Sequence, residues 1–177
     1  MAKNAAQPRR PDGIDEDLVK RSSEHHHAGT LSLLVLGSVV AWGASGYAGS
    51  RNHTHAVEAS ALRLRVATPS LIRNGEIYET TIDVGAKRRI DKLVIGVSPA
   101  LWRETTMNAM TPAAAAESSE AGLFRFAYDK VEAGASFTVK IDLQINPTLF
   151  GNNAGVIVVF DGDERLAELP LNLRVLP

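Results

Sequence analysis

Histidine and acidic side chains are the groups in this 177-residue chain that could bind a metal or move a proton. All five histidines lie before residue 56, as the triplet His25–His27 and the pair His53 and His55. Neither group has an evident carboxylate partner, and metal-bound histidines need such partners to hold their geometry. Residues 56–177 contain no histidine, which excludes a Ser-His-Asp arrangement and a histidine zinc site there. We expect no catalytic residue, no bound metal and no cofactor.

The composition narrows the class of protein further. Cysteine is absent, which excludes disulfides, thiol catalysis and cysteine-ligated metals. The chain has 19 Lys+Arg against 20 Asp+Glu, so no overall positive charge attracts nucleic acid. Acidic residues gather at Asp161, Asp163 and Glu164, around an Asp-Gly pair that is typical of a tight hairpin turn. These features favour a non-enzymatic protein that does not bind nucleic acid.

An uncharged run of 22 residues extends from Ala28 to Gly49. About 20 apolar residues cross a bilayer as a helix, so we predict a transmembrane helix over 28–49. A cleaved signal peptide is the alternative, because "GYA" at 46–48 suits a signal peptidase. The preceding tail, 1–27, is long and contains five acidic residues, unlike a signal peptide's short basic start, and this favours an uncleaved anchor.

The flanking segments suggest an orientation. Residues 1–27 are polar and have no apolar periodicity, so we expect a disordered cytoplasmic tail, followed beyond the helix by a short tether at 50–60. Basic residues are slightly more numerous before the uncharged run than after it. We therefore expect the bacterial cytoplasmic membrane, with the N-terminus inside and an exported domain at 61–177.

Small residues recur at every fourth position of the predicted helix, as Gly37, Ala41, Ser45 and Gly49. Such a stripe allows the backbones of two helices to approach closely in lipid. It indicates either an integral-membrane protein partner or self-association through this helix, in addition to contact with the lipid bilayer. Small residues are also frequent throughout this run, so chance is an alternative.

From Ala61 onward the apolar residues alternate with a period of two, which is typical of strands. The clearest segment is "SFTVKIDLQIN", with Phe137, Val139, Ile141, Leu143 and Ile145 predicted to face inward. Similar segments begin near residues 61, 76, 92, 122, 155 and 165. Short strands separated by turn signals predict an all-β fold, an antiparallel sandwich of seven or eight strands.

The segments "IRNGEIYETTIDVGAKRRIDKLVIGV" and "FRFAYDKVEAGASFTVKIDLQI" resemble the bacterial immunoglobulin-like repeats of envelope proteins. The resemblance covers roughly Ser70 to Ile145, and it departs from that family at "GAKRRID", where an Asn-rich turn is usual. It implies an immunoglobulin-like sandwich and, by analogy, a binding or spacer role.

Two segments are candidates for a partner surface. Arg88 and Arg89 lie in the basic turn "AKRRIDK", which contacts only solvent, anionic lipid headgroups or an acidic partner. Trp102 either docks a partner or closes one end of the core. The Ala- and Ser-rich segment at 111–122 reads as a mobile loop or a short helix.

Together these patterns predict a non-enzymatic, single-pass membrane accessory subunit. It would bind an integral-membrane partner through its helix and its exported sandwich. The alternative is a free-standing envelope module that binds a soluble protein or a glycan.

Overall fold

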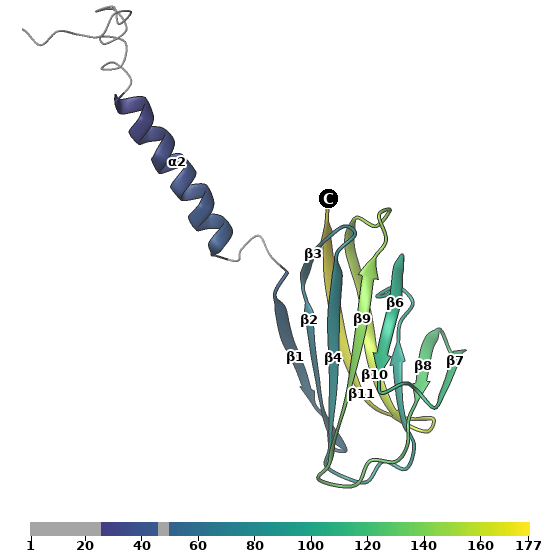
Figure 1. The fold of residues 1–177 in the computed structure, drawn as a ribbon. Helices are drawn as coiled ribbons and strands as arrows, with labels where there is room; N and C mark the ends of the chain where they lie inside the picture. Colours follow the sequence, from purple (N-terminus) through teal and green to yellow (C-terminus); the bar gives the residue numbers. More distant parts are fainter. Residues whose placement is uncertain (1–25, 46–49) are drawn as a thin grey trace, which may run out of the picture. The chain divides into compact units, whose positions relative to one another are not determined.

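The computed structural model describes residues 26–45 and 50–177, which belong to two separate units, one helical and one made of strands (Figure 1). The predicted tail at 1–27 lies almost wholly outside the described residues. The helical unit contains α2 (His26–Ala44). The β unit contains eleven strands in the described chain.

Helix α2 covers most of the uncharged run, while residues 46–49 of the predicted span lie outside the described residues. Its large apolar side chains are all exposed and point in every direction around the axis, namely Leu31, Leu33, Leu34, Val35, Leu36, Val39, Val40 and Trp42. The part of the chain that the structure describes contains no helix that is both long enough and apolar enough to cross a membrane.

The β unit consists of two sheets. In the five-stranded sheet, called sheet A here, the order is β1 (Asn52–Glu58), β2 (Leu62–Pro69), β4 (Ile77–Ala86), β9 (Ser136–Ile145) and β6 (Thr105–Thr111). In the six-stranded sheet, sheet B, the order is β3 (Leu71–Arg73), β11 (Glu164–Leu176), β10 (Gly151–Asp161), β5 (Leu93–Val97), β8 (Leu123–Ala127) and β7 (Ala116–Glu120).

The core lies between the two sheets and follows the alternation of the sequence. In β9, Val139, Ile141, Leu143 and Ile145 are buried as predicted, while Phe137 is half-buried against Tyr128. Because successive side chains of a strand point to opposite faces, every second residue enters the core. The core is largely apolar, with Thr80 and Asn153 as buried polar residues of the described chain, and one continuous cluster joins residues of β2, β4, β5, β9, β10 and β11.

The topology is that of an immunoglobulin-like sandwich, as predicted. Strands β2, β4, β9 and β6 stand in the order of the A-B-E-D sheet, and β11, β10 and β5 in the order G-F-C. All pairs are antiparallel except β3 with β11. The arrangement departs from the seven-strand one because β1 extends sheet A beside β2, β3 pairs with β11, and the chain returns to sheet B as β7 and β8 before it forms β9.

The predicted count of seven or eight strands was too low, and the tether at 50–60 was wrong. Residues 52–58 form β1, which pairs with β2 at every position and packs Val57 against the core. The segment at 111–122 contains no helix, and it is a loop only in part, because 116–120 form β7 on β8. Edge strands such as these are held by backbone pairing on one side, so they need no apolar alternation.

Candidate binding surfaces

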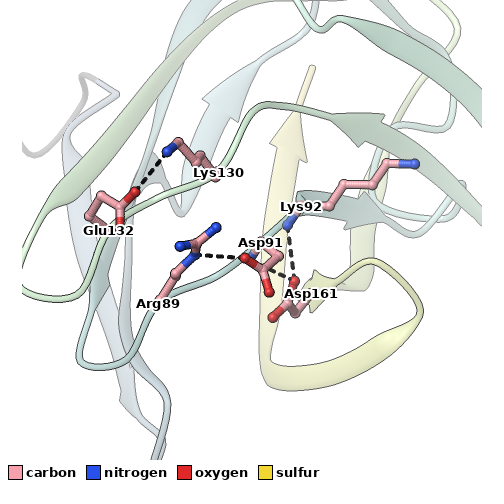
Figure 2. A network of polar contacts seen from close by, with 6 residues as sticks. All are labelled: Arg89, Asp91, Lys92, Lys130, Glu132 and Asp161. Carbon is pink, nitrogen blue, oxygen red and sulfur yellow. Dashed lines mark hydrogen bonds and ion pairs between the residues drawn. The ribbon is translucent and has the colours of Figure 1, made fainter.

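The predicted partner residues Arg88 and Arg89 lie in the connection between β4 and β5, and both are exposed. Arg88 Nη2 donates to Glu164 Oε1 at 2.8 Å, and Arg89 Nε donates to Asp91 Oδ1 at 2.7 Å (Figure 2 draws the second pair). Each charge therefore already has an opposite charge beside it. Exposed ion pairs of this kind add little stability, but they cancel the positive field of the connection.

The neighbouring cations are paired in the same way. Lys87 Nζ lies 2.6 Å from Glu58 Oε2, and Arg63 donates to the same carboxylate. Lys87 and then Arg63 hold the pKa of Glu58 below its ordinary value. Lys130 lies 3.0 Å from Glu132 and lowers the pKa of that carboxyl, with the charges of Lys130 and Arg89 adding to the effect. A charge-balanced surface favours the solvent-exposed interpretation of the basic turn over an anion site.

Asp161 ties this connection to the hairpin turn between β10 and β11. Its Oδ1 accepts hydrogen bonds from the backbone N–H groups of Asp91 at 2.9 Å and Lys92 at 3.0 Å (Figure 2). In return the Gly162 N–H donates to the Lys92 carbonyl. The acidic cluster predicted to form a turn therefore does so, and one of its carboxylates fixes the start of β5.

Trp102 lies five residues beyond the C-terminal end of β5, and its side chain is half-buried. Its ring stacks on Phe124, with centroids 6.4 Å apart, and contacts Phe126 at 5.6 Å. It also packs against the core cluster, which agrees with the core-closing interpretation. Because β5 is about 16 Å long, Trp102 lies at the opposite end of that strand from Arg88 and Arg89. The three residues do not form one surface.

Close packing holds the segment that carries Trp102. A Cβ added at Gly155 would lie 2.2 Å from Ser98 Oγ and 2.7 Å from Leu101 Cβ. The same Ser98 Oγ accepts a hydrogen bond from the Val156 N–H at 2.9 Å. Glycine at 155 thus lets residues 98–101 lie directly against β10.

The structure reveals a groove that was not predicted from the sequence. It lies on the outer face of sheet B, has a volume of about 310 Å³ and is lined by Lys92, Val94, Ala116, Ser118, Glu120, Arg125, Ala127, Gly162 and Asp163. The groove exists because the side chains there are small on three neighbouring strands, β7, β8 and β5. The only sequence signal was the small residues at alternate positions of 116–120, whose pairing with β8 was not predicted.

Arg125 forms one wall of the groove, and its side chain is only 12% exposed. It donates to Glu120 Oε2 and Asp163 Oδ1, each at 3.0 Å, and to the Gly162 carbonyl at 2.7 Å. Its guanidinium also lies 4.9 Å from the centre of the Phe160 ring. These contacts hold the β7–β8 hairpin beside the β10–β11 turn and give the groove a rigid, charged rim.

On the helix, Gly37 and Ala41 of the predicted stripe lie in α2, and Ser45 follows its end. The Ser45 N–H donates to the Ala41 carbonyl at 2.9 Å, which continues the helical pattern to that residue. A Cβ added at Gly37 would meet nothing within 4 Å. Gly49, the fourth residue of the stripe, lies outside the described residues.

No family model matches this chain, and no curated protein matches it significantly. Among solved structures, it is similar to the CARDB domain of a Pyrococcus furiosus protein crystallised with di-metal ions, at 11% identity, a TM-score of 0.41, and coverage of 68% of this chain and 93% of that one. It is also similar to an Archaeoglobus fulgidus cohesin, at 11% identity, a TM-score of 0.38, and coverage of 62% and 88%. A further match is a chain of the complex between zinc 2-glycoprotein and prolactin inducible protein from human seminal plasma, at 10% identity, a TM-score of 0.40, and coverage of 68% and 98%.

Proposed function

We propose that this protein is a non-enzymatic accessory subunit of an integral-membrane partner in the bacterial cytoplasmic membrane. Its N-terminal helix would be the anchor, with the tail inside the cell and the immunoglobulin-like sandwich in the periplasm. The sandwich would present its outer surfaces to the partner.

The apolar surface of α2 is the observation that carries this proposal. Eight large apolar side chains between Leu31 and Trp42 are each more than half exposed, and they leave no polar face. A helix that is apolar all round is stable only when lipid or protein covers it. The uncharged run continues in the sequence to Gly49, beyond the end of α2, which gives the anchor a length of 22 residues.

Carbonate extraction of cells that express the full chain tests the anchor. We expect the wild-type chain to remain in the membrane pellet, as integral proteins do. Leu34→Arg with Val39→Arg should release it, because each charge costs about 3 kcal/mol at the centre of a bilayer. The matched control is Leu34→Ile with Val39→Ile, which should stay in the pellet. Release of the wild-type chain, or a mature N-terminus near Ala48, would contradict the anchor.

A second experiment tests whether the small-residue stripe binds a partner. Ala41→Leu with Ser45→Leu keeps the run apolar, so membrane insertion should survive. Helix contact should weaken by about 1–2 kcal/mol, a 5- to 30-fold loss of the co-purified partner in mild detergent. Ser32→Leu with Gly43→Leu adds similar volume on the opposite side of the helix and serves as the control. Equal losses from both variants would argue against the stripe.

The orientation can be checked in spheroplasts. External protease should degrade the sandwich, while a tag at Met1 should stay protected. The reverse pattern would contradict the proposed topology.

The groove on sheet B favours a second candidate function, a free-standing envelope module. Its volume of about 310 Å³ is at the lower end of the range for small-ligand pockets. Its rim carries two acidic and two basic side chains, so a glycan or a short polar segment of a soluble protein would fit its chemistry. If the stripe variant leaves the co-purified proteins unchanged, glycan-array binding by the wild type and Ser118→Trp would test this candidate.

A further inference from the structure

The two sheets have four edge strands, and three of them carry features that discourage pairing with another chain. Strand β3 has only three residues. Strand β7 has five residues and carries Glu117 and Glu120. Strand β6 is interrupted by a bulge between Met107 and Ala109. Short length, charge and bulges are the usual means by which proteins protect sheet edges.

The fourth edge, β1, has none of these features. It is seven residues long and pairs with β2 at every position from Asn52 to Glu58 without a bulge. It contains no proline, and its one acidic residue, Glu58, is bound to Arg63 and Lys87 of the same chain. Every second backbone N–H and C=O group of β1 points away from β2, which leaves a regular row of pairing groups along the open edge.

We infer that β1 is a strand-addition surface and that its partner is β1 of a second copy of this chain. The two strands would run antiparallel, with His55 of each copy on the twofold axis. Sheet A of one copy would then continue into sheet A of the other. This interaction goes beyond the proposed membrane function, since it uses neither the helix nor the groove.

In this register no two acidic side chains of β1 face each other. Asn52 faces Glu58 of the second copy, Thr54 faces Ala56, and His53 faces Val57, each pair occurring twice by symmetry. Small residues flank the centre. The strand from Asn52 to Val57 contains no aspartate, glutamate, lysine or arginine, so it offers little to select a strongly charged peptide from another protein.

Single cysteines give a direct test, because the natural chain contains none. The full chain with His55→Cys, oxidised in its host cells, should form a disulfide-linked dimer, since this residue faces its own copy. Ser118→Cys, in the middle of the β7 edge, is the matched control and should give at least fivefold less dimer. Directly opposed residues of an antiparallel pair lie within the distance that a disulfide requires.

Mixed chains test the register. Thr54→Cys and Ala56→Cys, co-expressed with different tags, should cross-link to each other more than either does to itself. Ala56→Lys should reduce the His55→Cys dimer at least fivefold, because a lysine on an edge discourages strand pairing, whereas Ser118→Lys should not. Dimer yields from His55→Cys no higher than from Ser118→Cys, or cross-links only to a different protein, would overturn the inference. If carbonate releases the chain from the membrane but the cross-linked dimer still forms, the anchor fails while the pairing of β1 strands stands.

Discussion

At the scale of single residues, glycines and acidic side chains decide how the loops of the sandwich are placed. Asp161 holds two backbone N–H groups of the connection that begins β5. Gly155 leaves room for Ser98 and Leu101, and so for the segment that seats Trp102 on the core. None of these contacts is local in sequence.

Gly155→Ala should destabilise the sandwich. The new Cβ would lie 3.0 Å or less from Ser98 Oγ, Leu101 Cβ and the Leu101 backbone nitrogen, so this segment must shift. We expect unfolding of the full chain in mild detergent and urea, followed by circular dichroism, to give a loss of about 1–3 kcal/mol.

Gly85→Ala is the control for that substitution. Its Cβ would meet other atoms at 3.7 Å or more, which is ordinary contact distance, in the interior of a strand. Its effect should be within about 0.5 kcal/mol. Equal stability of the Gly155→Ala and wild-type chains would contradict the close approach.

At the scale of elements, the hairpin of β7 and β8 has a two-residue turn in which both residues must adopt a positive φ. Glu120 pairs with Leu123, so the turn contains only Ala121 and Gly122, both with positive φ, at 50° and 74°. This is the geometry of a type I′ turn, in which Asn-Gly is the favoured pair. The left-handed backbone of Ala121 costs conformational free energy, and the pairing of β7 with β8 and the contacts of Arg125 offset this cost.

Ala121→Asn should therefore stabilise the hairpin, because asparagine tolerates the left-handed region better than alanine. We expect the unfolding free energy to rise by about 0.5–1 kcal/mol. The same denaturation measurement on Ala133→Asn, an exposed position without a positive φ, provides the comparison. A loss of stability at Ala121→Asn would mean that the turn has a different conformation.

At the scale of the whole molecule, the core depends on side chains that must stay neutral. Burial raises the pKa of Tyr78 to about 12, an effect that a hydrogen bond with Thr105 partly offsets. Burial, and then the charge of Glu117, raises the pKa of Tyr128 to about 12. Both rings lie in the core cluster between the sheets.

The sandwich should lose stability steeply between pH 10 and pH 12. In this window an unfolded tyrosine, with a pKa near 10, has released its proton, while the folded one keeps it. The unfolded state therefore binds fewer protons, and the unfolding free energy falls as the pH rises. The largest slope that Tyr78 alone can contribute is a loss of about 1.4 kcal/mol of unfolding free energy per pH unit.

Urea titrations at pH 8, 9, 10 and 11 would measure this slope. Tyr78→Phe should flatten it, and the titration of lysines, common to both chains, cancels in the comparison. If the double variant Tyr78→Phe with Tyr128→Phe has the same slope as the wild type, the raised pKa values of these tyrosines would be contradicted.

The sequence by itself determined the strand segments of the core and the all-β class of the sandwich. Alternation is a local signal: Val139, Ile141 and Leu143 face inward because a strand turns every second side chain to one face. It also determined the apolar run of α2 and the acidic turn at Asp161. Each of these depends on residues that are neighbours in the chain.

Only the tertiary structure decided which strands form the edges, and therefore what the surface offers. Strands β1 and β7 depend on pairing with a neighbour and show little alternation of their own, so β1 was predicted as a tether and β7 as part of a loop or short helix. The charge of Arg88 is balanced by Glu164, 76 residues away, and the groove on sheet B forms where strands from distant segments meet. Contacts between segments so far apart leave no periodic trace in the sequence, because the neighbours of each residue are set only when the sheets assemble.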